Sequence, residues 1–173
     1  MHNFFELINL GIKNNLDYLN NVESEVLKEL EYSAATILIK NLQSINLQKA
    51  IIITGAFSIF ESRLQDSLNC NNGFKEVRTL LKAKNKTELK YKFELFYMAI
   101  NVIKHGKGKS YDRLALEKEL PFKLIHQSHQ SFEEGNISEI HTLIKVDDKF
   151  IYDCLDLINK IITLFQSEKY ILI

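Results

Sequence analysis

The chain has 173 residues, of which 46% are hydrophobic and 25% are charged, so it can form one folded domain with a substantial core. One proline and six glycines exclude a many-stranded β-sandwich or barrel, which needs frequent turns. The 22 basic and 22 acidic residues cancel, but residues 74–118 hold 12 basic against five acidic residues, which leaves that segment at +7 and favours phosphate partners.

Apolar residues recur every three or four positions along the first part of the chain, a spacing typical of amphipathic helices. The pattern predicts helices over residues 3–19, 22–43 and 47–68. Asn71-Asn72-Gly73 follows the third helix. Gly73 is expected to end that helix, because glycine readily adopts a positive φ.

The middle of the chain predicts two further helices. A short helix over residues 74–84 precedes a longer one that is capped by Asn85 or Thr87 and runs to about His105. Gly106 is expected to stop this longer helix. Its apolar residues recur at helical spacing and mark the face that is buried in the core.

In the last third of the chain, the spacing of the apolar residues changes. Residues 111–120 fit a short helix that ends before Pro121. Residues 122–146 contain two short apolar runs around a polar stretch, which favours an inserted β-hairpin. The final helix opens on Asp147 and Asp148, whose carboxylates suit the positive end of a helix dipole.

These elements predict an all-α fold, an up-and-down helical bundle with a small β-hairpin inserted near residues 122–146. A single domain is expected, because no repeat, low-complexity run or linker interrupts the chain. The predicted parts of this domain (residues 1–173) are N-terminal helices (1–45), core helices (47–120), the hairpin (122–146) and a C-terminal helix (147–169).

The sequence predicts a cytoplasmic protein. The N-terminus has no basic segment followed by an apolar run, and no uncharged apolar stretch reaches the roughly 18 residues of a membrane span. Cys70 and Cys154 lie far apart and predict no disulfide framework. The other histidines, His126, His129 and His141, are interpreted as surface residues, so neither a metal nor another cofactor is expected.

The segment Asn101-Val102-Ile103-Lys104-His105-Gly106-Lys107-Gly108-Lys109-Ser110 is the chemically unusual part of the chain. Asn101 and His105 lie one helical turn apart on one face. Glycines 106 and 108 let backbone amides approach a ligand, and Ser110 is expected to cap the next helix.

This residue set suits RNA chemistry. His105 is a candidate general acid or base, and Asn101 could orient a phosphate or a 2′-hydroxyl. Lys104 or Lys107 could stabilise the charge that develops on phosphorus-bound oxygens during cleavage. The alternative is structural: a histidine before glycine is also an ordinary helix C-terminal cap, and the lysine-glycine loop an ordinary basic turn.

The segment resembles the motif of HEPN domains (higher eukaryotes and prokaryotes nucleotide-binding), which are all-α bundles. Many are metal-independent ribonucleases of toxin–antitoxin and defence systems, and they usually act as dimers with a composite cleft. Their motif is an Arg, commonly followed by Asn, with a His a few residues later. Asn101 and His105 match the Asn and the His of this motif.

The resemblance covers about residues 47–120 and the last helix. It implies His105, Asn101 and Lys104 as catalytic residues, and Glu61 as a carboxylate that orients His105. The residues predicted to bind phosphate, from the positive charge and the helix start that follow His105, are Lys107, Lys109, Ser110 and Arg113. RNA, a second copy of the chain and an antitoxin-like protein are the partners that the resemblance implies.

One position departs from the family pattern, because Ile100 stands where the motif has its Arg. Arg binds phosphate in a bidentate way that Lys does not reproduce. Two interpretations therefore stay open: an RNA-directed protein that is a metal-independent endoribonuclease, and a catalytically inactive module for dimerisation or partner binding. A nucleotide-binding loop is disfavoured, because Gly106–Ser110 lacks the phosphate-loop pattern.

Overall fold

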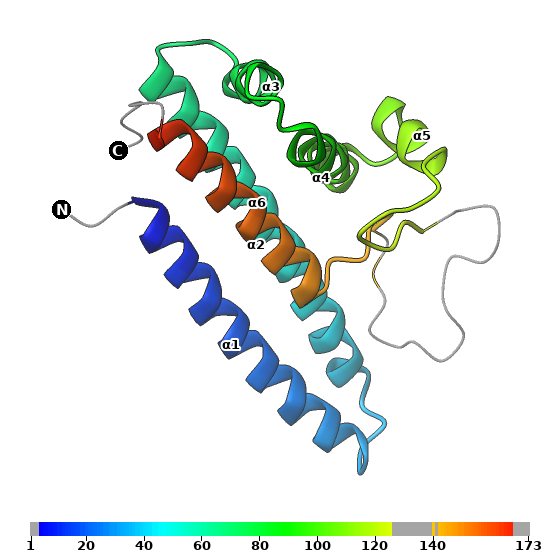
Figure 1. Cartoon of the computed structure of the whole chain (residues 1–173). Coiled ribbons are helices and arrows are strands. Elements are labelled where there is room, and N and C mark those ends of the chain that lie inside the picture. The colour runs from blue at the N-terminus through cyan, green and yellow to red at the C-terminus, as the bar shows by residue number, and fades with distance from the viewer. Residues whose placement is uncertain (1–3, 126–139, 141, 168–173) are drawn as a thin grey trace.

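The computed structural model describes residues 4–125, 140 and 142–167, and within these residues the chain forms six α-helices and no strand (Figure 1). The predicted all-α bundle is thereby confirmed. Its helices are α1 (Phe4–Leu30), α2 (Thr36–Leu68), α3 (Gly73–Ala83), α4 (Thr87–His105), α5 (Lys109–Ala115) and α6 (Asp148–Ser167).

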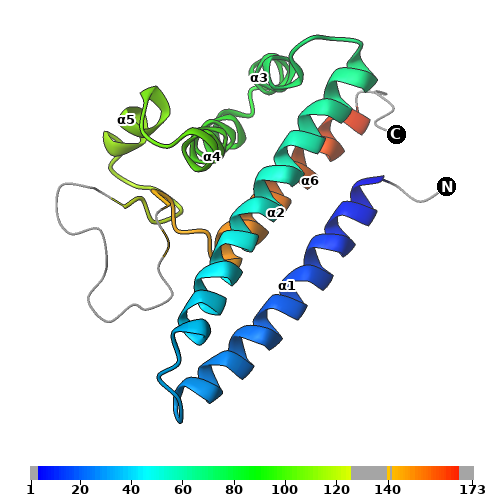
Figure 2. The same ribbon diagram turned by 180° about the vertical axis from the view of Figure 1, so that it is seen from behind.

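Three long helices, α1, α2 and α6, pack lengthwise, while α3 and α4 cross them (Figures 1 and 2). Helix α1 is antiparallel to α2, but α6 runs in the same direction as α2 (Figure 1). The order therefore departs from the strict up-and-down arrangement that the sequence predicted. Short helix α5 packs on α4 at the far side of the molecule from α1.

The first two helices are longer than predicted. Helix α1 continues through the break expected near residues 20–21, and α2 continues through the one expected near 44–46, so both predicted breaks were wrong. The chain turns at residues 31–35 instead. Asn20, at the first predicted break, donates a hydrogen bond from Nδ2 to Oδ2 of Asp148 on α6 at 2.6 Å. It is therefore a polar contact between helices.

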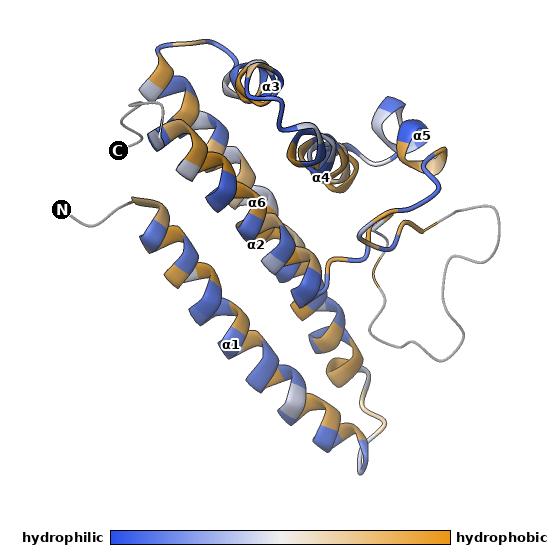
Figure 3. Ribbon diagram, in the orientation of Figure 1, coloured by the Kyte–Doolittle hydropathy of each residue, from blue (hydrophilic) through white to orange (hydrophobic). Residues whose placement is uncertain are grey.

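Aromatic rings hold the crossing helices together. Phe60 of α2 packs on Phe74 of α3 at 5.9 Å between ring centroids, and Phe74 packs on Phe93 of α4 at 5.5 Å. Phe96 of α4 packs on Phe150 of α6 at 5.4 Å. These contacts bury the apolar stripes that the sequence predicted, and hydrophilic residues occupy other faces of the same helices (Figure 3).

Gly73 does not end α2, contrary to the prediction. Asn69 takes the left-handed conformation after α2, with φ 46° and ψ 53°. Gly73 instead starts α3 and is buried against α2. A Cβ atom there would lie 2.6 Å from Cβ of Leu64 and 2.9 Å from the carbonyl oxygen of Glu61. The glycine is required for close helix packing and not for a positive φ.

Two predicted caps of the later helices were also wrong, and two others are confirmed. Asn85 is left-handed (φ 53°) and α4 starts at Thr87 without a side-chain cap. Ser110 lies inside α5, which begins one residue earlier and ends at Ala115 instead of residue 120. Gly106 ends α4 as predicted, with φ 73°. The two aspartates open α6 as predicted: Oδ1 of Asp147 accepts a hydrogen bond from the backbone N–H of Phe150.

The predicted hairpin is not confirmed. Leu124 and Ile144 form a single antiparallel bridge, supported by backbone hydrogen bonds from Ile125 to Leu143 (2.9 Å) and from Lys145 to Lys123 (3.0 Å). Residues 126–139 and 141 of the predicted hairpin lie outside the described residues. Among the described helices, none combines the length and the apolar character that crossing a bilayer requires.

We expect Gly73→Ala to lower the free energy of unfolding by about 1–3 kcal/mol, because the added methyl group meets the backbone of α2. Gly11→Ala is the matched control. A Cβ at Gly11 meets nothing within 4 Å, so this change inside α1 should stabilise by about 0.5–1 kcal/mol. Urea unfolding of both variants measures the difference, and equal effects of the same sign would contradict the packing role of Gly73.

Candidate functional site

The two residues of the predicted site lie at the C-terminal end of α4. His105 is the last residue of that helix and is exposed, and Asn101 is half-buried one turn earlier. Both side chains lie on the same side of the helix because they are four residues apart. In the part of the chain that the structure describes, no hydrogen bond joins His105 to Asn101.

The loop after His105 carries exposed positive charge. Gly106 holds φ 73°, a conformation that favours glycine, and its N–H donates to the carbonyl oxygen of Val102 at 2.8 Å. The side chains of Lys104, Lys107 and Lys109 are exposed, as is that of Arg113 on α5. Ser110 is half-buried on the same helix.

Two further positions of the predicted site, Ile100 and Glu61, lie on α4 and α2. Ile100, at the position where the HEPN motif has its Arg, is only 4% exposed and belongs to the core. The backbone carbonyl oxygen of Glu61, on α2, lies next to Gly73 at the start of α3. Phe74, the residue after Gly73, packs on Tyr97 of α4. Tyr97 lies about 12 Å before His105 along the axis of that helix. No contact between Glu61 and His105 is described, so the orienting role of Glu61 stays a prediction.

The positive segment of the sequence forms one side of the molecule. Helices α3, α4 and α5 pack in series and lie away from α1 (Figure 1). Two of the cations on this side are neutralised: Arg78 pairs with Glu94 at 2.6 Å, and Lys92 pairs with Asp153 at 3.4 Å. The charges around His105 have no such acidic partner among the described residues.

A second polar site, which the sequence analysis missed, lies between α1, α2 and α6. The side chain of Lys49 on α2 is 7% exposed. Its Nζ lies 2.9 Å from Oδ1 of Asp148 on α6 and 3.3 Å from Oε2 of Glu23 on α1. Asn20 of α1 completes the contacts of Asp148 from the other side. We call these four residues the Lys49 cluster.

Within the Lys49 cluster, the pKa values of Lys49 and Asp148 shift in opposite directions. Burial by itself lowers the pKa of Lys49, but the hydrogen bond to Asp148 and the negative charge of Glu23 outweigh burial and raise it. Burial by itself raises the pKa of Asp148, but hydrogen bonds from Lys49 and Asn20 outweigh burial and lower it. The ion pair is therefore fully charged around neutral pH.

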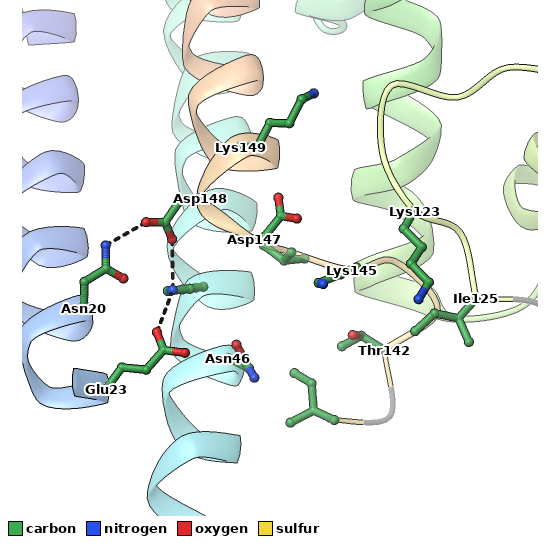
Figure 4. Close-up of a pocket in the computed structure, with 13 residues that line it drawn as sticks. Asn20, Glu23, Asn46, Lys123, Ile125, Thr142, Lys145, Asp147, Asp148 and Lys149 are labelled. Carbon is green, nitrogen blue, oxygen red and sulfur yellow. Dashed lines mark hydrogen bonds and ion pairs between the residues drawn. The ribbon is translucent and has the colours of Figure 1, made fainter. Parts of the chain in front are cut away.

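A hollow of about 440 Å³ lies next to the cluster. Figure 4 shows Asn20, Glu23 and Asp148 on one side of it and Lys123 and Thr142 on the other. Of the described lining residues, four are lysines and three are carboxylates, so the hollow suits a polar occupant. It shares no lining residue with the segment around His105.

The sequence did contain a signal for Lys49. Ile45, Lys49 and Ile53 follow one another at a spacing of four residues, so the lysine stands on the buried stripe of α2. A cation on a buried stripe requires a partner, and the partners come from helices 26 and 99 residues away in the sequence. Among the described residues, no group of three or more His, Cys, Asp or Glu side chains is arranged to hold a metal ion.

The chain was compared with known proteins in three ways. No protein-family model matches it, and neither the curated proteins nor the solved structures contain a match.

The pKa shift of Asp148 predicts a pH-dependent contribution to stability. A lowered pKa in the folded state stabilises above the unfolded-state value near 3.9, and this contribution is lost as the pH falls through the folded-state pKa. We expect Asp148→Asn to lower the free energy of unfolding by about 1 kcal/mol at pH 7, a discounted value because a third of the side chain is exposed. The difference from wild type should shrink below about pH 4.

Denaturant unfolding between acidic and neutral pH measures this effect. Asp156→Asn is the control, because the Asp156 side chain is 47% exposed and its pairs lie at the surface. An Asp148→Asn loss that is the same at every pH would mean that its carboxylate contributes through packing and not through charge.

Proposed function

We propose that the chain is an RNA-directed protein of the HEPN-like type, of the kind found in bacterial toxin–antitoxin and defence systems. The observation that carries the proposal is the exposed cationic surface at the end of α4, where His105 and Asn101 lie next to Lys104, Lys107 and Lys109. Such a surface attracts the phosphate backbone independently of sequence. The all-α bundle is also the architecture that the resemblance implies.

We further propose cleavage without a metal as the activity of this surface. The 2′-hydroxyl of a bound nucleotide attacks the adjacent phosphorus, and the bond to the 5′-oxygen of the next nucleotide breaks. The products are a 2′,3′-cyclic phosphate and a 5′-hydroxyl. His105 takes the proton from the 2′-hydroxyl or gives one to the leaving oxygen, and solvent water completes the other proton transfer. Asn101 orients the phosphate, and Lys104 stabilises the developing negative charge. Lys107, Lys109, Ser110 and Arg113 hold the flanking phosphates.

A specific observation favours a second candidate function, an inactive dimerisation or partner-binding module. Ile100 is part of the core, so the position of the family's Arg supplies neither a charge nor a surface side chain. A lysine in the loop provides a point charge but lacks the planar, bidentate geometry of a guanidinium. The two candidates differ in whether His105 affects RNA turnover.

RNA binding should depend on salt and on the lysines near His105. Log affinity for RNA falls linearly with log salt concentration, with a steeper slope for more phosphate contacts. We expect Lys104→Gln/Lys107→Gln to make this slope shallower by roughly 1.4, the value for two phosphate contacts to a single strand. The control is Lys13→Gln/Lys28→Gln on α1, where both lysines are exposed, and it should keep the wild-type slope. Fluorescence anisotropy of a labelled mixed-sequence RNA measures the slopes of the wild type and of both variants. Equal slopes for the wild type and the Lys104→Gln/Lys107→Gln variant would contradict RNA binding by this surface.

Cleavage should depend on His105. In EDTA, the wild type should cut single-stranded RNA, and His105→Ala should lower the rate at least about 100-fold, the usual contribution of a general acid or base. Asn101→Ala should also slow cleavage, whereas Asn14→Ala on the exposed face of α1 should not. Gel analysis of labelled RNA measures the rates. Binding without cleavage by the wild type would contradict the ribonuclease and favour the binding module.

A further inference from the structure

Two lysines lie side by side at the edge of the hollow next to the Lys49 cluster. Leu124 and Ile144 pair in the antiparallel bridge, and the backbone N–H of Lys145 donates to the carbonyl oxygen of Lys123 at 3.0 Å. Residues paired in this way have Cα atoms about 5.5 Å apart and side chains on the same face. Both lysine side chains are exposed, and both line the hollow. The backbone therefore sets two positive side chains next to each other.

This lysine pair is unfavourable unless an anion binds to it. Like charges directly opposite each other on paired segments destabilise the pairing. Lys145 has no ionic partner in the part of the chain that the structure describes. A phosphate monoester carries a charge of about −1.5 to −2 near neutral pH, whereas a carboxylate carries a single negative charge. A phosphate therefore matches the two ammonium groups better than a carboxylate does.

Across the hollow, α1 and α2 present hydrogen-bonding groups (Figure 4). Glu23 of α1 uses Oε2 to pair with Lys49, so its Oε1 is left without a partner among the described residues. Asn46 lies about one turn before Lys49 on α2, and its half-buried side chain also lines the hollow. A carboxylate next to a carboxamide offers both acceptors and donors, as hydroxyl groups require. An ammonium group fits less well, because Lys49 already supplies a positive charge there.

The size and the remaining lining of the hollow suit a small ligand. Its volume of about 440 Å³ lies within the range of roughly 300–1,000 Å³ that is usual for ligand pockets. Ile125 and Val146 add apolar atoms to the lining, against which the C–H groups of a sugar ring can pack. The hollow thus combines a cationic end, a hydrogen-bonding end and an apolar surface.

We propose that this hollow binds a sugar phosphate. The ammonium groups of Lys123 and Lys145 hold the phosphate through charge-assisted hydrogen bonds, and Glu23 and Asn46 bind the hydroxyl groups of the sugar. The inference does not depend on the proposed RNA role, because none of the residues around His105 lines the hollow.

Isothermal titration calorimetry of the full chain with glucose 6-phosphate, fructose 6-phosphate and ribose 5-phosphate tests the site. At least one of these probes should bind with a dissociation constant below about 1 mM. Lys145→Gln should weaken that binding at least about tenfold, because it removes a charge-assisted hydrogen bond. Lys13→Gln on α1 is the control, since Lys13 is exposed and lies outside the hollow. Weaker binding of all three probes, or equal effects of the two variants, overturns the proposal.

Inorganic phosphate and unphosphorylated glucose separate the two ends of the ligand. Each should bind at least about tenfold more weakly than the best sugar phosphate, because each reaches only one end of the hollow. Asn46→Ala should weaken the sugar phosphate at least about fivefold and leave inorganic phosphate unchanged. Inorganic phosphate that binds as tightly as the sugar phosphates would reject the sugar, and glucose that does so would reject the lysine pair.

A charge reversal separates binding from folding. Lys145→Glu places a carboxylate opposite Lys123, so it should raise the thermal unfolding midpoint by about 1–3 °C and bring binding of the sugar phosphate below detection. Circular dichroism melting and the same titration measure the two effects. A variant that still binds like the wild type contradicts the role of the lysines. A lowered midpoint contradicts the repulsion between them.

Discussion

Among the described residues, one cation, Lys49, is buried, and it joins the three long helices of the bundle. The ammonium group of Lys49 on α2 can be buried because Asp148 on α6 and Glu23 on α1 supply opposite charge. These two ion pairs fix the relative positions of the three long helices. An ammonium group in this position tolerates neither a shift of α6 along α2 nor a rotation of α1, because either would leave a charge unpaired. The aromatic contacts between α2, α3 and α4 then set the crossing of the remaining helices.

Local patterns predicted the helices well and their boundaries less well. The stripes of α2, α4 and α6 follow from apolar spacing alone, and Gly106 stops α4 as its conformational freedom predicts. The failures at Asn20 and Gly73 have a common cause. Asn20 bonds to a carboxylate 128 residues away, and Gly73 lies against the backbone of α2. Residue type gives no local sign of such distant partners.

The candidate site, like the fold, was predicted from the sequence only in part. The placement of Asn101 and His105 on one helical face, beside an exposed basic loop, follows from a spacing of four residues and a glycine stop. The Lys49 cluster and its hollow could not be assembled from sequence, because their residues come from α1, α2, α6 and the segments joined at the bridge of Leu124 and Ile144. The surface around His105 and the interior around Lys49 are thus separate parts of the molecule.

The free energy of unfolding of Lys49→Met tests the role of the buried cation most directly. Removing the ammonium leaves two carboxylates facing each other, so we expect a loss of about 1–3 kcal/mol at pH 7. Lys49→Met/Glu23→Gln/Asp148→Asn should recover most of that loss. A Lys49→Met protein within about 0.5 kcal/mol of wild type, as expected for an ordinary surface lysine, would contradict the account.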